Sequence, residues 1–179
     1  LNEKRSLGKG EIIRPFLNLS KSDLKIYIDE NDLPYVQDDT NLNNDFDRNF
    51  LRNEIVPSLE KRWSKLSERA SLTSLTAKKK KLSLDFMLEK DFKKEISTGI
   101  IERARFIEIP SFLIEELIRL ILRKKGIALP SQKVLSEIMN VFFHKKPSNE
   151  SYVEWSRKDG EQIGGKVFSE HNDIIFKKK

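Results

Sequence analysis

The sequence predicts a mainly α-helical protein with small β elements, which places it in the α+β class. Three observations lead to this prediction. Apolar residues recur at helical spacing through much of residues 58–143. Short runs that alternate apolar and polar residues follow residue 146, as in a small antiparallel meander. Near the N-terminus, one apolar run at residues 11–17 has the length of a strand.

Length and composition limit the kinds of site that the chain can hold. With 179 residues, it can form one domain or two small ones. It has no cysteine, which excludes disulfides, thiolate zinc sites and cysteine nucleophiles. No apolar run reaches about 18 residues and no signal peptide is visible, so we expect a cytoplasmic protein with no membrane span. Because the first residue is Leu1 rather than methionine, we expect an internal piece of a longer chain, or missing first residues.

The net charge of +6 is concentrated in the middle of the chain. Residues 60–105 hold 13 Lys and Arg against 7 Asp and Glu, whereas residues 1–59 hold 8 against 11. A basic segment of this kind is typical of a protein that contacts a nucleic-acid backbone. A solvated helix face explains the same excess, and charge alone favours that interpretation.

The N-terminal segments predict the end of an α/β unit. The first ten residues are polar and predict a loop. Residues 11–17 predict a strand that ends near Pro15. Ser20 is a good N-cap for a helix that ends near Asn31, and residues 33–36 predict a short extended piece. Strand, helix and strand-like segment in succession suggest an α/β unit whose other strands precede this chain.

A polar loop from Asp38 to Asp47 leads into a helix that carries Arg48 and Arg52, four residues apart. The apolar residues of this helix are Leu51, Ile55 and Leu59. A step of about 100° per residue places both arginines on the same side as these residues. We therefore expect both guanidinium groups to face inward, where an unpaired charge is very costly and needs an anion.

Two interpretations of the arginines remain open. Ion pairs with Asp38 or Asp39 would fasten the loop to the helix, and geometry alone favours this structural role. A bound anion such as a phosphate would instead make the arginines part of a ligand site. A calcium loop starting at Asp39 is excluded, because its sixth residue is Asn44 instead of Gly and its twelfth is Phe50 instead of Glu.

The middle of the chain, from residue 58 to about residue 91, predicts long helical structure. Trp63 lies at helical spacing from Leu59, which favours a core position, although an aromatic ring beside basic residues could also stack on a base. The helix contains a run of four lysines, Lys78, Lys79, Lys80 and Lys81. These lysines point in nearly every direction around the helix axis, so we expect the run to be exposed. It either contacts RNA phosphates or solubilises the helix, and the pattern favours the second role.

The last third of the chain predicts a helix pair followed by a β-meander. The first helix begins at Ser111 and is closed by Gly126, and the second begins at Ser131. Three strands follow, with turns at Asp159-Gly160 and His171-Asn172. The only histidines, His144 and His171, have no evident acid–base partner, so we expect a surface role for both and no metal site.

Four short motifs, in order, resemble those of the tRNA(Ile)-lysidine synthetases. They are Ile12-Ile13-Arg14-Pro15, Asp39-Thr40-Asn41, Arg48-Asn49-x-x-Arg52 and Pro57-Ser58-Leu59. The family pattern reads roughly I-R-P-L, D-x-S/T-N, R-N-x-x-R and P-x-L. The resemblance is strongest over residues 12–60 and continues more weakly, in the same order, to the C-terminus.

The resemblance implies a division into three parts. Residues 1–62 would be the C-terminal part of a PP-loop catalytic domain, residues 63–105 a basic helical linker, and residues 106–179 a central tRNA-associated domain. Members of the family use ATP and Mg²⁺ to adenylate C2 of the wobble cytidine of tRNA(Ile) with a CAU anticodon. The amine of free L-lysine then displaces AMP, and the family often forms homodimers. Its ATP-gripping S-G-G-x-D-S loop does not occur in this sequence, so we expect ATP and Mg²⁺ to be bound mainly outside this chain.

The matching residues are the predicted site. The resemblance implies catalytic roles for Asp39, Arg48 and Arg52, and substrate binding by Thr40, Asn41 and Asn49. The Asp39 carboxylate would contact an amine or orient Arg48, and the two arginines would meet a phosphate or tie the loop to the helix. Three classes of function remain open: part of this tRNA-modifying ligase, a stand-alone basic RNA-binding module, and a helical interaction domain without chemistry.

Overall fold

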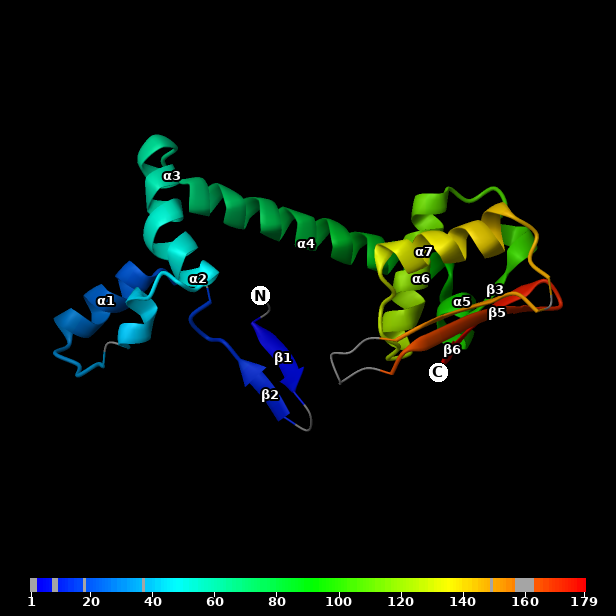
Figure 1. The fold of residues 1–179 in the computed structure, drawn as a ribbon, viewed down its shortest axis with the longest axis horizontal. Coiled ribbons are helices and arrows are strands. Elements are labelled where there is room, and N and C mark those ends of the chain that lie inside the picture. The colour runs from blue at the N-terminus through cyan, green and yellow to red at the C-terminus, as the bar shows by residue number, and fades with distance from the viewer. Residues whose placement is uncertain (1–2, 8–9, 18, 37, 149, 157–162) are drawn as a thin grey trace. The chain divides into compact units, whose positions relative to one another are not determined.

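The structure is a computed structural model that describes residues 3–7, 10–17, 19–36, 38–148, 150–156 and 163–179. The chain divides into two compact units, which we call unit 1 (residues 1–75) and unit 2 (residues 76–179). The long helix α4 (Leu66–Asp91) begins in unit 1 and ends in unit 2 (Figure 1).

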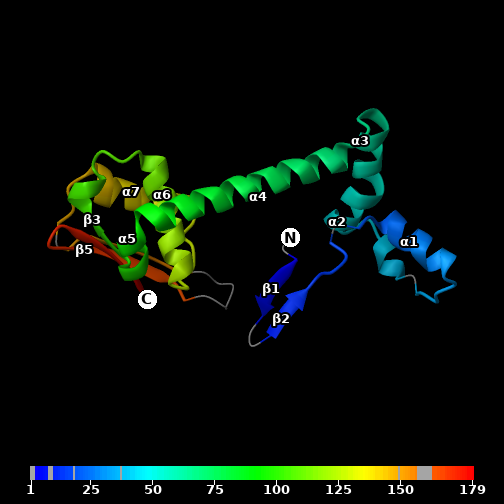
Figure 2. The ribbon, with the colours of Figure 1, turned by 180° about the vertical axis from the view of Figure 1, so that it is seen from behind.

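Unit 1 opens with an antiparallel hairpin (Figure 2). Strand β1 (Lys4–Leu7) pairs with β2 (Gly10–Ile13), with Lys4 opposite Ile13. The predicted strand at residues 11–17 therefore starts earlier and is shorter, and the predicted loop before it contains a strand. This prediction was wrong because β1 has almost no apolar pattern, and its strand conformation depends on backbone pairing with β2.

Helix α1 (Lys21–Glu30) begins and ends where the sequence predicts. The Ser20 hydroxyl accepts a hydrogen bond from the Asp23 N–H at 3.0 Å, and the Asp23 carboxylate accepts one from the Ser20 N–H at 3.0 Å. This reciprocal pair is a capping box, which satisfies two N–H groups that lack partners inside the helix. The C-cap is Asn31, whose side chain donates to the Tyr27 carbonyl at 2.8 Å.

A continuous helical segment follows the polar loop. It consists of α2 (Asp47–Phe50), the π-helical turn η2 (Leu51–Ile55) and α3 (Val56–Arg62). The Val56 N–H donates to the carbonyl of Leu51, five residues earlier. Pro57 has no N–H to donate and lies in the first turn of α3, where it interrupts no hydrogen bond of that helix.

Unit 1 has no buried apolar side chain among its described residues, and only Asn49 is buried there. Trp63, which we predicted to lie in a core, is 51% exposed. This prediction was wrong because α3 ends at Trp63 and the chain turns at Lys65, which has a φ of 65°. The Arg62 guanidinium lies over the indole, 5.5 Å from the ring centroid.

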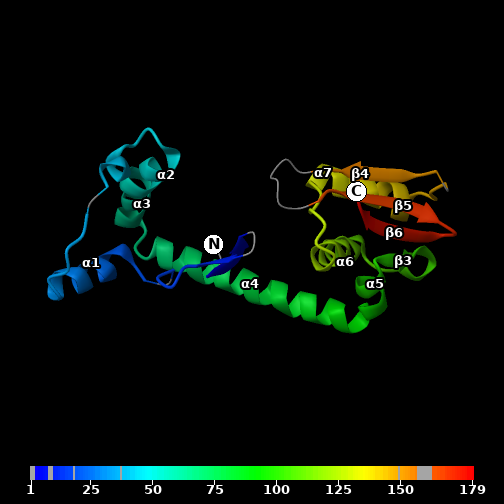
Figure 3. The same ribbon diagram turned by 90° about the horizontal axis from the view of Figure 1, so that it is seen from below.

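Unit 2 contains a four-stranded antiparallel sheet with the strand order β3-β6-β5-β4 (Figure 3). The strands are β3 (Ile100–Glu102), β4 (Tyr152–Trp155), β5 (Gly165–Glu170) and β6 (Asp173–Lys178). The helices after α4 are α5 (Lys93–Thr98), α6 (Ser111–Lys124) and α7 (Gln132–Met139). Two shorter turns are the 3₁₀ turn η3 (Arg103–Phe106) and the π-helical turn η4 (Asn140–His144).

The core of unit 2 lies between α6, α7 and one face of the sheet. Helix α6 contributes the largest set of buried side chains, namely Ile114, Leu117, Ile118, Leu120, Ile121 and Leu122. From the sheet, alternate residues such as Val153, Val167 and Ile174 are buried. Each fully buried aliphatic side chain contributes about 1.5–3 kcal/mol, so this cluster is the main source of stability in unit 2.

Glycines end two helices of unit 2. Helix α6 closes with a Schellman motif, in which the Ile127 N–H donates to the Leu122 carbonyl at 2.9 Å and Gly126 has a φ of 63°. Helix α5 ends at Gly99, which has a φ of 73°. Left-handed backbone is strained for residues with a side chain, so both positions favour glycine.

The predicted α+β class, the helix pair and the antiparallel meander are confirmed. The turn at His171-Asn172 is also confirmed, with φ values of 51° and 72°, whereas the predicted turn at Asp159-Gly160 lies outside the described residues. The division at residues 62 and 105 stays a prediction. In the part of the chain that the structure describes, no helix is both long and apolar enough to cross a membrane.

We predict that stability depends much more on the core of unit 2 than on the apolar surface of unit 1. Ile118→Ala empties a fully buried site, so it should lower the free energy of unfolding by about 2–5 kcal/mol in urea titrations. The control Ile26→Ala removes a side chain that is 55% exposed and should change it by less than about 0.5 kcal/mol. Equal losses in the two variants would contradict this prediction.

Candidate functional site

The polar loop begins with a turn that Asp38 organises. Its carboxylate accepts hydrogen bonds from the Thr40 N–H at 2.9 Å and from the Thr40 hydroxyl at 2.7 Å. The Asp38 carbonyl accepts from the Asn41 N–H at 3.0 Å and from the Asn41 side chain at 3.1 Å. These bonds start the 3₁₀ turn η1 (Asp39–Leu42) and place Asp38 at its N-cap.

The loop is fastened to the helix by asparagine side chains. The amide nitrogen of Asn49 donates to the carbonyls of Thr40 and Asn43, both at 2.8 Å. One helical turn later, Asn53 donates to the Asn41 carbonyl at 3.0 Å and to the Asn44 side chain at 2.9 Å. Loop carbonyls have no partner in regular secondary structure, and the side-chain amides of the helix supply one.

The predicted substrate binding by Asn49 stays a prediction, and its position also gives it a structural role. It is only 8% exposed, and its amide nitrogen is already bonded to two loop carbonyls. We therefore regard Asn49 as a residue that positions the turn. The role of Asn53 was missed, although its spacing of four residues from Asn49 places both amides on one side of a helix.

Hydrogen bonding lowers the pKa of the Asp38 carboxyl below its ordinary value of 3.8. The larger cause is the bond from the Thr40 hydroxyl, followed by the bond from the Thr40 N–H. Both bonds favour the charged carboxylate, which accepts them more strongly than a neutral acid would. Asp38, at the N-cap of η1, is thus ionised near neutral pH.

The prediction that Arg48 and Arg52 face inward is wrong for the described part of the chain, because both side chains are exposed. Neither forms a hydrogen bond or an ion pair with a described residue. The helical wheel failed because the apolar stripe that it used is itself uncovered, and Leu51 is 51% exposed. Asparagine amides therefore fasten the loop to its helix, in place of the ion pairs that we considered.

The other predicted site residues lie on the exposed turn next to this helix. Asp39 and Asn41 are exposed, and the Thr40 hydroxyl is used by Asp38. The structure brings the turn, Arg48 and Arg52 together on one short stretch of unit 1, because Asn49 lies between the arginines and bonds to the turn. The roles predicted for Asp39, Thr40, Asn41, Arg48 and Arg52 stay predictions.

We expected the whole run of lysines to be exposed, but one of the four is not. Lys78, Lys79 and Lys80 are exposed. Lys81 is half-buried and forms ion pairs with Asp85 at 2.8 Å and with Glu116 at 2.7 Å. Because two carboxylates already hold the Lys81 ammonium, the prediction of a phosphate contact is retained for the first three lysines only.

The described residues offer no evident cluster for a metal ion. No group of three or more His, Asp or Glu side chains that could hold a metal ion occurs among them. The Asp38 carboxylate is used by Thr40. We therefore assign no metal ligand among these residues. Of the two histidines, His171 forms the β5–β6 turn and is exposed, and His144 Nε2 lies 3.3 Å from the Ser111 hydroxyl.

Residues 1–59 match the model of a PP-loop domain. This segment contains the Asp38 turn and the helix that carries Arg48 and Arg52. The N-terminal part of this chain is therefore a segment of the PP-loop class.

The chain is also similar in sequence to tRNA(Ile)-lysidine synthases. It is 32% identical over 174 residues to tRNA(Ile)-lysidine synthase of Coxiella burnetii, a match that covers 94% of this chain and 39% of the relative. It is 33% identical over 148 residues to tRNA(Ile)-lysidine synthase of Buchnera aphidicola subsp. Acyrthosiphon pisum, covering 82% of this chain and 34% of the relative. A match to the enzyme of Wigglesworthia glossinidia brevipalpis has 34% identity over 146 residues and covers 76% of this chain and 35% of the relative. The chain thus spans well under half the length of these relatives.

We predict that Asn49 holds the turn in place. Asn49→Ala leaves the carbonyls of Thr40 and Asn43 without this partner, which costs about 1–3 kcal/mol. Hydrogen exchange at the Asn41 and Asn43 amides should then become roughly ten- to a hundredfold faster. The matched control is Asn31→Ala, which removes an asparagine cap from α1 and should leave these amides unchanged. Unchanged exchange in Asn49→Ala would show that the turn does not depend on this side chain.

We also predict that the turn loosens only in acid. The folded pKa of Asp38 lies below 3.8, so its stabilising effect is present above the unfolded pKa and is lost as the pH falls through the folded pKa. In NMR titrations, the Thr40 amide signal should move with a midpoint below pH 3.8. Asp38→Asn cannot titrate and should abolish this movement. A midpoint above the ordinary value would refute the assigned hydrogen bonds.

Proposed function

We propose that this chain is part of an ATP-dependent ligase that joins free L-lysine to C2 of the wobble cytidine of tRNA(Ile) with a CAU anticodon. In the proposed reaction, ATP adenylates the base and the lysine amine then displaces AMP. The observation that carries the proposal is the asparagine-fastened turn beside two arginines that form no ion pair with a described residue, within a segment that matches a PP-loop domain. The similarity to tRNA(Ile)-lysidine synthases over 94% of the chain supports the same conclusion.

The proposed roles follow from the chemistry of the exposed groups. Arg48 and Arg52 present two guanidinium groups, whose planar donors match a phosphate of the nucleotide or of the tRNA. Asp39 presents a carboxylate that can hold the ammonium group of lysine or orient Arg48. Thr40 and Asn41 shape the turn beside these groups, and Asn49 holds that turn against the helix.

The proposal includes ligands and partners beyond the described residues. ATP and Mg²⁺ would be used by the full-length enzyme, with the metal stabilising phosphate charge. A homodimer remains a prediction from the family resemblance.

The test replaces each arginine in the full-length protein. Arg48→Ala and Arg52→Ala should each slow lysidine formation by about a hundredfold, as expected when a donor to developing negative charge is removed. Both side chains are exposed, so each change should alter the free energy of unfolding by less than about 0.5 kcal/mol. The rate is measured as incorporation of labelled lysine into tRNA(Ile).

The matched control is Arg69→Ala, which removes an exposed arginine of the same unit from α4 and should keep the wild-type rate. Near wild-type rates in the Arg48 and Arg52 variants would contradict the assigned roles. Activity lost together with folding would make the arginines structural. Salt-sensitive tRNA binding by a full-length protein that forms no lysidine would favour a stand-alone RNA-binding module instead.

A further inference from the structure

Five lysines from three separate parts of the chain gather around two adjoining hollows of unit 2. The first hollow has a volume of about 400 Å³ and is lined by Lys93, Lys124 and Lys125 together with Glu89, Ile96 and Ser97. The second has a volume of about 270 Å³ and is lined by Lys125, Lys177 and Lys178 together with Ile127 and Phe176. Because Lys125 lines both hollows, they form one basic surface, which we call the basic groove.

The fold positions the lysines of the basic groove through ordinary backbone contacts. The Phe176 N–H of β6 donates to the carbonyl of Gly99 at 2.9 Å, which holds the end of β6 beside the end of α5. The aliphatic part of Lys125 lies against Gly99 so closely that a Cβ at that position would overlap it. A Cβ on Gly126 would lie 3.7 Å from the Lys178 ammonium nitrogen. Gly99 thus leaves room for Lys125, whereas a side chain at Gly126 would make only an ordinary contact with Lys178.

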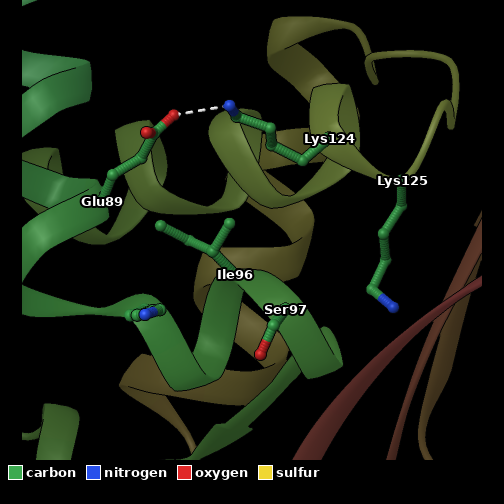
Figure 4. A pocket seen from close by; sticks show the side chains of 6 residues that line it. Glu89, Ile96, Ser97, Lys124 and Lys125 are labelled. Carbon is green, nitrogen blue, oxygen red and sulfur yellow. Dashed lines mark ion pairs between the residues drawn. The ribbon is translucent and has the colours of Figure 1, made fainter.

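Figure 4 shows how two of these side chains leave the end of α6. Lys124 points to Glu89, with the ammonium nitrogen 2.7 Å from the carboxylate. Lys125 points away from Lys124 and Glu89, and both Lys125 and Ser97 of α5 line the first hollow. The carbonyl ends of α5 and α6 carry partial negative charge, which favours cations and helps to explain why lysines can gather here.

The charge balance of the basic groove differs from that of neighbouring surfaces. Where α4 faces α6, several cations have carboxylate partners: Lys81 pairs with Asp85 and Glu116, and Arg123 pairs with Asp85 at 2.9 Å. Among the described residues that line the two hollows, Glu89 is the only acid. With the described residues, only Lys124 of the five lysines forms an ion pair.

Five ammonium groups opposed by one carboxylate repel one another, so their gathering does not stabilise the fold. An anion with several charges would relieve this repulsion. One phosphate could not meet lysines that line two separate hollows, whereas a chain of phosphates can. We propose that the basic groove binds consecutive phosphates of an RNA backbone. This inference rests on the proposed function, which supplies a tRNA as the substrate.

The test compares two triple variants of the full-length protein. Lys93→Gln, Lys125→Gln and Lys178→Gln together remove three charges from the basic groove and keep the first two methylene groups of each side chain. The control changes three exposed lysines of unit 2 outside it, Lys133→Gln, Lys145→Gln and Lys146→Gln. The two variants have the same net charge, and thermal unfolding checks that both remain folded.

The probe is a tRNA(Ile) transcript with a CAU anticodon, titrated at several salt concentrations by fluorescence anisotropy. The groove variant should bind about tenfold or more weakly, and its log–log salt slope should become shallower by roughly 2 to 3, as expected when three phosphate contacts are lost. A tRNA of different sequence should lose affinity to a similar extent, because phosphate contacts do not read bases. The control variant should bind nearly as tightly as the wild type.

The possible outcomes distinguish failure of the groove inference from failure of the proposed ligase function. If the groove and control variants lose tRNA affinity equally, net charge alone explains the loss, and the inference is overturned. Unchanged affinity in the groove variant would overturn it as well. If lysidine forms but the groove variant binds normally, the inference fails and the proposed function stands. If no lysidine forms but the groove variant alone loses affinity, the proposed function fails and the RNA-binding groove stands.

Discussion

Burial of helix α6 against the sheet is the constraint on which most of unit 2 depends. Its six buried aliphatic side chains reach the apolar face that β4, β5 and β6 present together. Because this packing determines where α6 ends, it also determines the positions of Lys124 and Lys125. Glu116 and Arg123 of α6 likewise come within reach of Lys81 and Asp85 of α4. The apolar core thus fixes the positions of charged residues on α6 that are not themselves part of the core.

Unit 1 is held together locally by a different interaction. It has no buried apolar side chain among its described residues, so hydrogen bonds must organise the candidate site. A side-chain amide suits this task because it carries two N–H donors and no net charge, so its burial costs less than that of a guanidinium. Asn49 bonds two loop carbonyls while the neighbouring Arg48 remains exposed. On this helix, the asparagine amides therefore bond to the turn, and the arginine side chains are exposed to solvent.

The lysines of unit 2 show why the number of charges in a segment is a poor guide to function. Lys81 belongs to the most conspicuous basic run in the sequence, yet two carboxylates hold it. Lys93, Lys125 and Lys178 belong to less conspicuous positions and line hollows that contain almost no acid. A lysine is available to a phosphate only when its neighbours in space do not already neutralise it.

The sequence by itself determined the local features, because they depend on residues that are near one another in the chain. These features include the Ser20 cap, the helix start at Ser131, the αL glycine at Gly126 and the His171-Asn172 turn. The motifs in residues 12–60 also pointed to the family that the relatives then supported. Only the tertiary structure decided that Arg48, Arg52 and Trp63 are exposed, that β1 pairs with β2, and that three distant segments form one basic groove. Burial, strand pairing and charge neutralisation depend on neighbours that lie far apart in the chain, and a helical wheel does not contain them.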